Sequence, residues 1–414
     1  MKETKQYCIS KNVVMEAWKR VKSNRGSFGI DGETIEAFEE NLKGNLYKIW
    51  NRMSSGTYFP PPVKTVSIPK KSGGTRNLGI PTVSDRVAQM VAKMYFEPQV
   101  DPEFHPDSYG YRPGKSAHQA IAVTRQRCWK YDWVLEFDIR GMFDNIDHEL
   151  LRKAVRRQTD CKWLLLYIDR WLQAPILDED GKLMPSNRGV PQGGVISPVL
   201  SNLFMHYVFD MWMKRKYPQL PFCRYADDGL VHCRSRQEAI QLKAELDLRF
   251  RECRLEMHPE KTKIICCRPG AETAPGTVTK FDFLGFQFRP RLVRARRGSM
   301  FVGFTPAISP DSAKHIREVI RSWKLSRQTH LDIKDLAQRL NPVIRGWINY
   351  YGKFNPSEFY KVLRYLDMRI TGWVKRKYRK QGNYKKKPIA WLGKVAKALP
   401  QLFVHWQYIR FPAE

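Results

Sequence analysis

The sequence predicts a mixed α+β protein in which an antiparallel sheet with helices on one face is followed by a bundle of helices. Three observations lead to this fold class. Segments with strand periodicity and segments with helix periodicity mix up to about residue 300. Two of the strand segments carry acidic residues that would meet at one sheet edge. Beyond about residue 305 only helical patterns remain. The chain has 414 residues, enough for two to four compact units.

The N-terminal part is predicted to be helical as far as three prolines at residues 60–62, which break regular structure. After them, residues 63–69 alternate like a strand. A basic turn rich in Gly follows, and residues 76–80 return as a second strand. Residues 85–97 then have the pattern of a helix.

Two further strand segments carry the acidic residues. Residues 134–139 predict a strand with Asp138 on its polar face, because Leu135, Phe137 and Ile139 share the opposite face. Residues 222–233 are apolar and β-prone on both sides of Asp227-Asp228, which predicts a hairpin with two carboxylates at its tip. Helices are expected at residues 148–157, at 197–213 with Ser197 as the cap, and at 236–252.

The C-terminal third is predicted to be a bundle of three helices preceded by a strand pair at residues 281–288. Ser309-Pro310 begins the first helix. The second covers residues 332–351, and we expect an interruption at Pro342. The third begins at Asn355-Pro356 and keeps an apolar stripe as far as Val374.

The charge of the chain indicates a polyanionic partner. There are 72 Lys and Arg against 41 Asp and Glu, a net charge of +31. Nucleic acid is the commonest partner of such proteins, although a ribosomal or membrane-surface protein would show the same excess. An aromatic content of 12% favours nucleic acid, because bases stack on aromatic rings. Residues 368–413 contain no acidic residue, and their basic cluster alternates with Trp373, Tyr378 and Tyr384, which favours nucleic-acid contact over a solvated tail.

Other classes of protein receive no support. The eight cysteines form no CxxC pair and the nine histidines no HxxxH pair, so no zinc site is predicted. No apolar run reaches membrane-spanning length, and the N-terminus lacks the apolar stretch of a signal peptide. We therefore expect a cytoplasmic protein that has no membrane partner.

The carboxylates predict a metal site. Two adjacent, mutually repelling carboxylates give a buried hairpin no structural advantage, and a cation would remove the repulsion. An ordinary turn is the alternative for Asp227-Asp228 taken alone. Nucleotidyl transfer uses two divalent ions held by carboxylates, and Mg²⁺ prefers such oxygen ligands. If the strand of Asp138 adjoins the hairpin, the three carboxylates meet there.

The tetrapeptide Tyr225-Ala226-Asp227-Asp228 resembles the YxDD box of reverse transcriptases. Other motifs of that family follow in family order, at residues 68–81, 108–113, 137–144, 188–198, 258–263, 283–286 and 345–351. On these motifs, residues 10–375 resemble the group II intron reverse transcriptase/maturase family. The chain ends at Glu414, soon after its basic helices, which resembles the short bacterial class C-like form without an HNH endonuclease.

The resemblance implies a right-hand polymerase, with fingers and an antiparallel palm sheet followed by a helical thumb. We expect four regions: residues 1–60 as an N-terminal helical extension of the fingers, 61–300 as fingers and palm, 301–385 as the thumb/maturase domain, and 386–414 as a basic C-terminal segment. The implied activity is RNA-directed DNA polymerisation, together with binding of intron RNA that promotes splicing and retrohoming.

The resemblance also implies roles for individual residues. Asp138, Asp227 and Asp228 would hold two Mg²⁺ ions, for which Mn²⁺ can substitute, and Lys261 would donate a proton to the leaving pyrophosphate. Phe143 would clash with a ribose 2′-hydroxyl. The residues expected to contact the incoming nucleotide are Lys70, Arg76, Ile139, Phe143 and Gln192. Those expected to contact nucleic acid are Arg112, Tyr225, Arg345, Trp347, Lys375, Arg376, Lys377, Arg379 and Lys380.

The implied partners are an RNA template such as intron RNA, a DNA or RNA primer, dNTPs and a DNA target, while the oligomeric state stays open. Two alternatives remain at this point. One is a freestanding, domesticated relative that acts in DNA repair or phage defence. The other is a maturase that mainly binds RNA, although the intact set of three Asp residues argues against it. An RNA-dependent RNA polymerase would need room for the 2′-hydroxyl that Phe143 would occupy.

Overall fold

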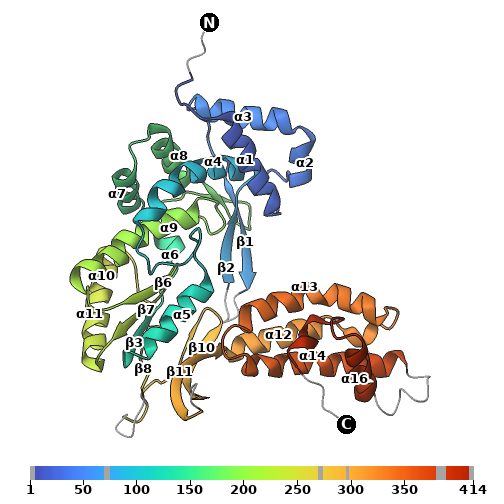
Figure 1. Cartoon of the computed structure of the whole chain (residues 1–414). Coiled ribbons are helices and arrows are strands. Elements are labelled where there is room, and N and C mark those ends of the chain that lie inside the picture. The colour runs from blue at the N-terminus through green and yellow to red at the C-terminus, as the bar shows by residue number, and fades with distance from the viewer. Residues whose placement is uncertain (1–4, 70–74, 269–273, 295–297, 379–387, 410–414) are drawn as a thin grey trace. The chain divides into compact units, whose positions relative to one another are not determined.

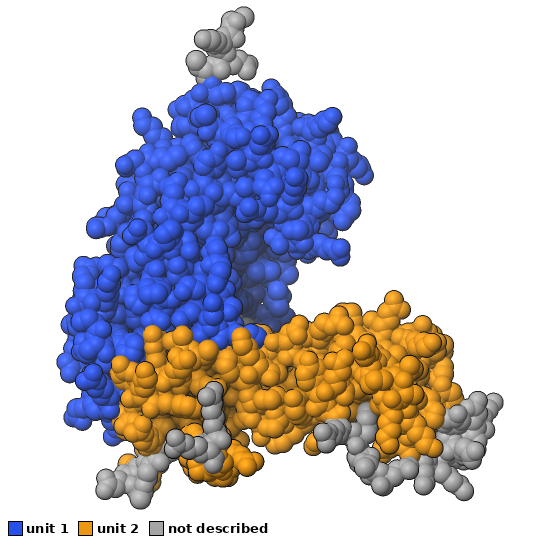
Figure 2. Space-filling model, viewed as in Figure 1, with its two compact units in different colours: residues 1–120, 135–264 blue, residues 121–134, 265–414 orange. Residues whose placement is uncertain are grey.

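The computed structural model describes residues 5–69, 75–268, 274–294, 298–378 and 388–409 (Figure 1). The chain forms two compact units, which are coloured separately in Figure 2. Unit 1 contains residues 1–120 and 135–264, and unit 2 contains residues 121–134 and 265–414. The mixed α+β class with a helical C-terminal region is confirmed. The boundary that we expected at residue 300 falls inside a strand of unit 2.

Unit 1 begins with the helices α1 (Lys11–Ser23), α2 (Ile35–Glu40) and α3 (Leu42–Ser54). Side-chain oxygens begin the first two, because Ser10 and Thr34 accept hydrogen bonds from backbone N–H groups of the first turns. The rings of Trp18 and Phe38 stack at 4.8 Å and join α1 to α2. The predicted N-terminal helices are therefore present.

The predicted basic hairpin consists of β1 (Val63–Pro69) and β2 (Thr75–Ile80), which pair antiparallel. They belong to a sheet of order β2-β1-β4-β5, with β4 at Ile176–Leu177 and β5 at Leu183–Met184. The turn that holds Lys70 lies outside the described residues. Thr82 caps α4 (Val83–Val100), which corresponds to the helix predicted at residues 85–97.

The second sheet of unit 1 has the order β6-β7-β3-β8. Its hairpin of β6 (Phe222–Tyr225) and β7 (Asp228–Cys233) is antiparallel, with Tyr225 opposite Asp228, as predicted. The other two strands are β3 (Trp133–Phe137) and β8 (Lys263–Cys266). Phe137 of β3 packs against Phe209 and Phe250, whose ring centroids lie 4.9 and 5.5 Å away. One face of the sheet is thereby covered by helices (Figure 1).

The α-helices between residues 117 and 252 are α5 (Ala117–Cys128), α6 (Met142–Asn145), α7 (His148–Gln158), α8 (Lys162–Gln173), α9 (Ser197–Met205), α10 (Met211–Lys216) and α11 (Arg236–Glu252). The helices predicted at residues 148–157 and 236–252 correspond to α7 and α11, whereas α5, α6 and α8 were not predicted. The helix expected at residues 197–213 differs, because a π-helical segment at His206–Asp210 separates α9 from α10. Ser197 is the first helical residue and does not cap it, since the cap position is Ile196.

Unit 2 combines an antiparallel sheet of order β11-β10-β9 with a helical bundle. Its elements are β9 (Phe281–Phe283), β10 (Phe286–Arg294), β11 (Met300–Ile308), α12 (Pro310–Ser322), α13 (Ile333–Tyr351), α14 (Pro356–Lys377) and α16 (Pro388–Ala398). Ser309 caps α12, as predicted. The expected interruption at Pro342 is wrong, because α13 continues through it. Leu340 and Ile344 on either side are buried in the core, and this packing holds the helix together despite the missing N–H group.

The segment after α14 shares the core of the helical bundle. Leu392, Phe403 and Trp406 are buried together with residues of α13 and α14. Residues 388–409, which we expected in a basic C-terminal segment, thus contribute apolar side chains to unit 2. No helix in the part of the chain that the structure describes is long and apolar enough to cross a bilayer.

Candidate active site

A buried ion pair stabilises the turn of the β6–β7 hairpin. The side chain of Arg224 is fully buried and donates to both carboxylate oxygens of Asp210, at 2.8 and 2.7 Å. It also donates to Asn202 Oδ1 at 3.1 Å and to the carbonyl oxygen of Ala226 at 3.0 Å. Ala226 has a φ of 58°, in the left-handed region that L-residues seldom adopt. The bond from Arg224 therefore stabilises the strained turn that presents Asp227.

A second segment lies against the same turn. The N–H of Tyr109 donates to the carbonyl of Arg224 at 2.9 Å. A Cβ atom on Gly110 would lie 2.5 Å from the backbone nitrogen of Ala226, so only glycine fits there. Tyr111 follows with a φ of 57°, and its ring centroid lies 6.4 Å from that of Tyr225. Burial, and after it the charge of Asp227, raises the pKa of Tyr111. The motif at residues 108–113 thus delivers a half-exposed tyrosine beside the carboxylates.

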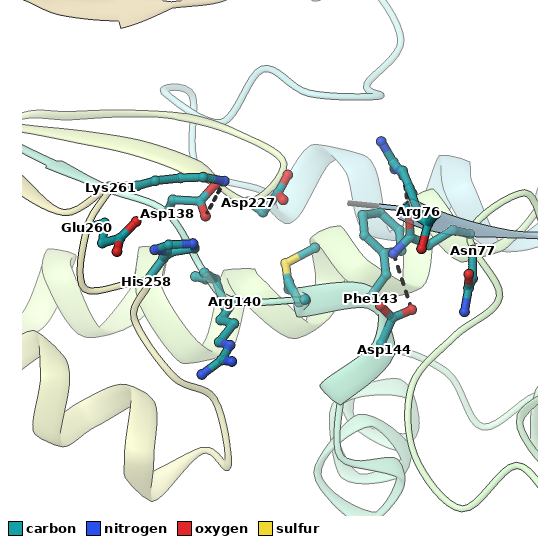
Figure 3. A pocket seen from close by; sticks show the side chains of 15 residues that line it. Arg76, Asn77, Asp138, Arg140, Phe143, Asp144, Asp227, His258, Glu260 and Lys261 are labelled. Atoms are coloured by element: carbon teal, nitrogen blue, oxygen red, sulfur yellow. Dashed lines mark hydrogen bonds and ion pairs between the residues drawn. The ribbon is translucent and has the colours of Figure 1, made fainter. Parts of the chain in front are cut away.

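Seven of the residues predicted for the site line one cleft of about 820 Å³ in unit 1 (Figure 3). Two are carboxylates, Asp138 after β3 and Asp227 in the hairpin turn. Arg76 enters from β2, and in the close-up it lies beside Phe143 and away from the carboxylates. The other predicted residues in the lining are Ile139, Gln192 and Lys261.

The carboxylates repel one another. Burial is the main reason that the pKa of Asp227 is raised, and the charge of Asp138 adds to it. Burial, followed by the charges of Asp227 and Asp138, raises the pKa of Asp228 to about 7. Asp228 is partly buried at the start of β7. The Nζ atom of Lys261 donates to Asp138 Oδ2 at 3.1 Å and offsets part of this negative charge.

The donor chemistry suits a hard divalent cation. Among the described residues, no three Asp, Glu, His or Cys side chains are grouped as a complete metal site. Asp138 and Asp227 line the cleft, whereas Asp228 is not part of its lining. Mg²⁺ prefers carboxylate oxygens together with phosphate oxygens and water, which is the type of ligand that these two residues offer. Asp228 follows Asp227 at the start of β7, and the charges of Asp227 and Asp138 contribute to its raised pKa. A cation there would relieve the repulsion that raises these pKa values.

The nucleotide-contact candidates form a chain of hydrogen bonds. The Nε atom of Arg76 donates to Gln192 Oε1, and Gln192 Nε2 donates to Asp144 Oδ1 at 3.2 Å. The Tyr111 hydroxyl is also hydrogen-bonded to Arg76. Arg76 is therefore held in the cleft by two neutral partners and has no carboxylate of its own among them. Such a guanidinium can bind an anionic phosphate. Lys70 lies outside the described residues.

Phe143 and Ile139 form the apolar side of the cleft. Phe143 retains 7% of its surface exposed and Ile139 retains 2%, so both are anchored in the core while their accessible edges line the opening. Phe143 belongs to α6, a single turn that begins after Gly141, whose φ is 54°. This turn directs Phe143 and Asp144 into the cleft, five and six residues after Asp138.

Three of the residues predicted to contact nucleic acid make contacts within the protein. The Arg112 side chain is 6% exposed and binds Asp101 at 2.7 Å as well as backbone carbonyls, so most of its hydrogen-bonding groups have partners inside the protein. Trp347 stacks on Trp323 at 5.5 Å. Lys377 donates to the carbonyls of Thr329 and Leu331 at 3.0 and 2.5 Å, which fixes the loop before α13.

Other predicted contacts are accessible. Arg345 on α13 and Lys375 and Arg376 on α14 are exposed, and all three belong to unit 2. Tyr225 is partly buried beside Tyr111. Arg379 and Lys380 lie outside the described residues.

Sequence reasoning missed several residues of the cleft. Asp144, Arg140, His258, Glu260 and Asn77 also line it. Asp144 could have been found, because it ends the motif at residues 137–144 and one helical turn brings it to the side of Phe143. Arg224 and Tyr111 gave no usable signal, since a buried arginine and a left-handed tyrosine are consequences of tertiary contacts.

Comparison with known proteins agrees with this geometry. Residues 68–288 match the family described as reverse transcriptase (RNA-dependent DNA polymerase), and residues 313–391 match the group II intron, maturase-specific domain. Protein YkfC of Escherichia coli K12 is 31% identical over 358 residues, which cover 75% of this chain and 88% of YkfC. Group II intron-encoded protein LtrA of Lactococcus lactis is 32% identical over 217 residues, 51% of this chain and 36% of LtrA. The chain thus matches most of YkfC and about a third of LtrA.

Proposed function

Because this chain belongs to the group II intron reverse transcriptase/maturase family and is an RNA-directed DNA polymerase, we propose that its cleft in unit 1 adds dNTPs to a primer on an RNA template. The observation that supports the proposal most is the composition of the cleft. Carboxylates, the guanidinium of Arg76 and an aromatic ring converge there from segments far apart in the sequence.

Each side chain has a part in this reaction. Asp138, Asp227 and Asp228 would hold two Mg²⁺ ions, which activate the primer 3′-hydroxyl and neutralise the triphosphate when bound. Arg76 binds phosphate oxygens of the nucleotide, and Gln192 orients Arg76 and contacts the nucleotide. The Nζ atom of Lys261, next to Asp138, is the candidate proton donor to the pyrophosphate.

Phe143 sets the choice of sugar. Its ring edge lines the cleft beside Asp144 (Figure 3), and its buried part cannot move away without disturbing the core. A ribose 2′-hydroxyl would collide with it. Selection of deoxyribonucleotides follows from this fixed position.

The two sheets of unit 1 would correspond to the fingers and palm of a right-hand polymerase, and the helical bundle of unit 2 to the thumb. The β1–β2 hairpin brings Arg76 to the nucleotide as a fingers element does. The sheet of order β6-β7-β3-β8 carries the carboxylates as a palm does.

Unit 2 would bind intron RNA and so promote splicing and retrohoming. The maturase-specific match at residues 313–391 supports this role, as does the name of LtrA, a group II intron-encoded protein. Exposed Arg345, Lys375 and Arg376 offer positive charge for phosphates.

The test is extension of a DNA primer on an RNA template with dNTPs and Mg²⁺, for the native chain and for Asp227→Asn/Asp228→Asn. A matched control is Glu39→Gln/Glu40→Gln, which removes the same charge from two adjacent exposed carboxylates on α2. We expect full-length cDNA from the native chain and the control, and at least a ~10³-fold slower extension by the Asp variant, since transition-state charge stabilisation is the largest catalytic term.

RNA affinity is measured in parallel. The Asp variant should bind RNA as tightly as the native chain, because its substitutions only remove negative charge. If the native chain binds RNA tightly and the Asp variant extends the primer equally well, the assignment of the site is wrong. If neither extends, the chain acts mainly as an RNA-binding maturase.

A further inference from the structure

Gln89 is a buried glutamine that connects the core of unit 1 to the loop of Gln192. It lies on α4 and is 3% exposed. Its Oε1 atom accepts hydrogen bonds from the backbone N–H groups of Val195, at 2.7 Å, and Ile196, at 3.3 Å. These N–H groups belong to the loop that follows Gln192 and precedes α9. Gln89, which does not line the cleft, is therefore hydrogen-bonded to the backbone of this loop.

The other end of the Gln89 amide is fixed by a buried carboxylate. Gln89 Nε2 donates to Asp85 Oδ2 at 2.8 Å. The second oxygen of Asp85 accepts from the Tyr58 hydroxyl at 2.7 Å and from Trp171 Nε1 at 2.8 Å. Asp85 is 1% exposed, so all these bonds form away from solvent. The orientation of the Gln89 amide is therefore determined, with its oxygen toward the loop.

The loop is anchored on its other side by the strand of Arg76. The N–H of Gly79 on β2 donates to the carbonyl of Gln192 at 3.1 Å. A Cβ atom on Gly193 would lie 2.3 Å from the carbonyl oxygen of Gly79. The loop therefore packs against the β2 backbone without space between them, and any movement of the loop would change the position of Gln192 relative to Arg76.

We propose that Asp85 and Gln89 are positioning residues that hold the Gln192 loop in register with β2, and thereby set the affinity of the cleft for the incoming nucleotide. They do not touch the nucleotide. Loss of the buried pair would leave the N–H groups of Val195 and Ile196 without an acceptor, and the loop would move to find one. The inference rests on the proposed contact between Gln192, Arg76 and the nucleotide.

The geometry allows a test by exchange of hydrogen-bond polarity. Gln89→Glu keeps an acceptor for the loop but places a second carboxylate against Asp85. Asp85→Asn keeps the acceptor for Tyr58 and Trp171 but turns an amide N–H₂ toward the Nε2 of Gln89. In the double variant, the amide introduced at position 85 donates to the carboxylate introduced at position 89, whose other oxygen still accepts from the loop. Every bond is restored and the net charge is that of the native chain.

The measurements are the KM for dNTP, kcat and the melting temperature of the full chain, with the primer–template saturating. Each single variant should raise the KM for dNTP by about tenfold, since one strained buried bond is worth about 1.4 kcal/mol. The double variant should return the KM to within about threefold of native, as coupled neighbours do. Gln99→Glu, an exposed glutamine of the same helix, is the matched control and should leave the KM unchanged.

Gln192→Ala distinguishes a missing contact between Gln192 and the nucleotide from a missing positioning role of Asp85 and Gln89. If Gln192→Ala leaves the KM for dNTP unchanged, the loop does not contact the nucleotide and both the role of Gln192 and the inference are wrong. If Gln192→Ala raises the KM while the single variants only lower the melting temperature and kcat, Asp85 and Gln89 are merely structural and the inference alone is overturned. If the single variants do not fold, a folded double variant with native KM supports the inference. A double variant that is unfolded or has a raised KM contradicts it.

Discussion

Phe143 is the residue at which sugar selection can be separated from polymerisation. Phe143→Ala should open the cleft to a 2′-hydroxyl and reduce the preference for dCTP over CTP by at least about tenfold, the effect of ~1.4 kcal/mol. The measurement is the ratio of kcat/KM for the two nucleotides. Phe204→Ala is the control, because Phe204 is also buried but lies on α9 outside the cleft. It should lower stability and leave the ratio unchanged. An unaltered ratio in Phe143→Ala would show that Phe143 does not exclude the ribose 2′-hydroxyl.

The ionised Asp228 carboxylate, which suits a metal ion, should destabilise the folded chain when no cation is bound. Its pKa is raised from 3.8 to about 7 in the folded chain, so the folded state binds the proton more tightly than the unfolded state. Its contribution to stability is therefore present below pH 3.8 and is lost as the pH rises through about 7. In EDTA, Asp228→Asn should melt at a higher temperature than the native chain, with a larger difference at pH 8 than at pH 5.

The melting curves are followed by circular dichroism. Asp180→Asn, in an exposed turn, is the control and should show no such growth of the difference with pH. A native chain whose melting temperature matches that of Asp228→Asn at pH 8 would mean that Asp228 is already relieved of its burial and repulsion without a cation.

The β6–β7 hairpin depends on one close contact with β3. A Cβ atom on Gly229 would lie 2.0 Å from Cζ of Phe137, whose ring is locked in the core. Gly229→Ala should therefore displace the hairpin, slow primer extension by about tenfold or more, and lower the melting temperature, since overpacking commonly costs about 1–3 kcal/mol. Gly372→Ala, at an exposed position of α14 where a Cβ atom meets nothing within 4 Å, is the control. It should be neutral or slightly stabilising.

Basic residues at the C-terminal end of α14 differ in their contacts: Lys375 and Arg376 are exposed, whereas Lys377 is bound to backbone carbonyls. Lys375→Gln/Arg376→Gln removes two exposed charges and should make the slope of log affinity for RNA against log salt less negative by about 1.4–1.8, with an unchanged melting temperature. Lys377→Met should lower the melting temperature and leave the salt slope unchanged, because the Nζ atom of Lys377 is bound to the carbonyls of Thr329 and Leu331. An unchanged salt slope in the double variant would mean that this end of α14 does not contact RNA.

The elements themselves were largely predictable, because local patterns determine them. The hairpin around Asp227-Asp228 and the helix at residues 236–252 follow from periodicity and from caps such as Ser235. The inward turn of Arg112 could not be predicted, because its acceptors are backbone carbonyls brought close by the fold. The continuity of α13 through Pro342 and the burial of Phe403 likewise depend on packing between distant segments. Within the site, residue types and order identified the carboxylates, whereas the supports of their turn required the tertiary structure.

For the whole molecule, the net charge of +31 should make nucleic-acid binding strongly dependent on salt. If about six to ten phosphates are contacted, affinity for RNA should fall by ~10³–10⁵ between 50 and 200 mM salt. Fluorescence anisotropy with labelled RNA measures this directly. The KM for dNTP at saturating primer–template serves as the comparison, because it reports a few contacts in the cleft and should change much less. A flat response of RNA affinity would contradict the nucleic-acid interpretation of the charge.

The indole of Trp129 donates to the carbonyl of Phe304 at 2.8 Å, across a separation of 175 residues. On a translating ribosome this bond cannot form until the later residue has been made. At roughly 5–20 residues per second, the wait is about 9–35 s. During that time the stretch at residues 121–134, which belongs to unit 2, has emerged while its partners are still unsynthesised. Until residue 304 has been made, the nascent chain therefore carries a segment of unit 2 between two parts of unit 1 whose hydrogen bond at Trp129 cannot yet form.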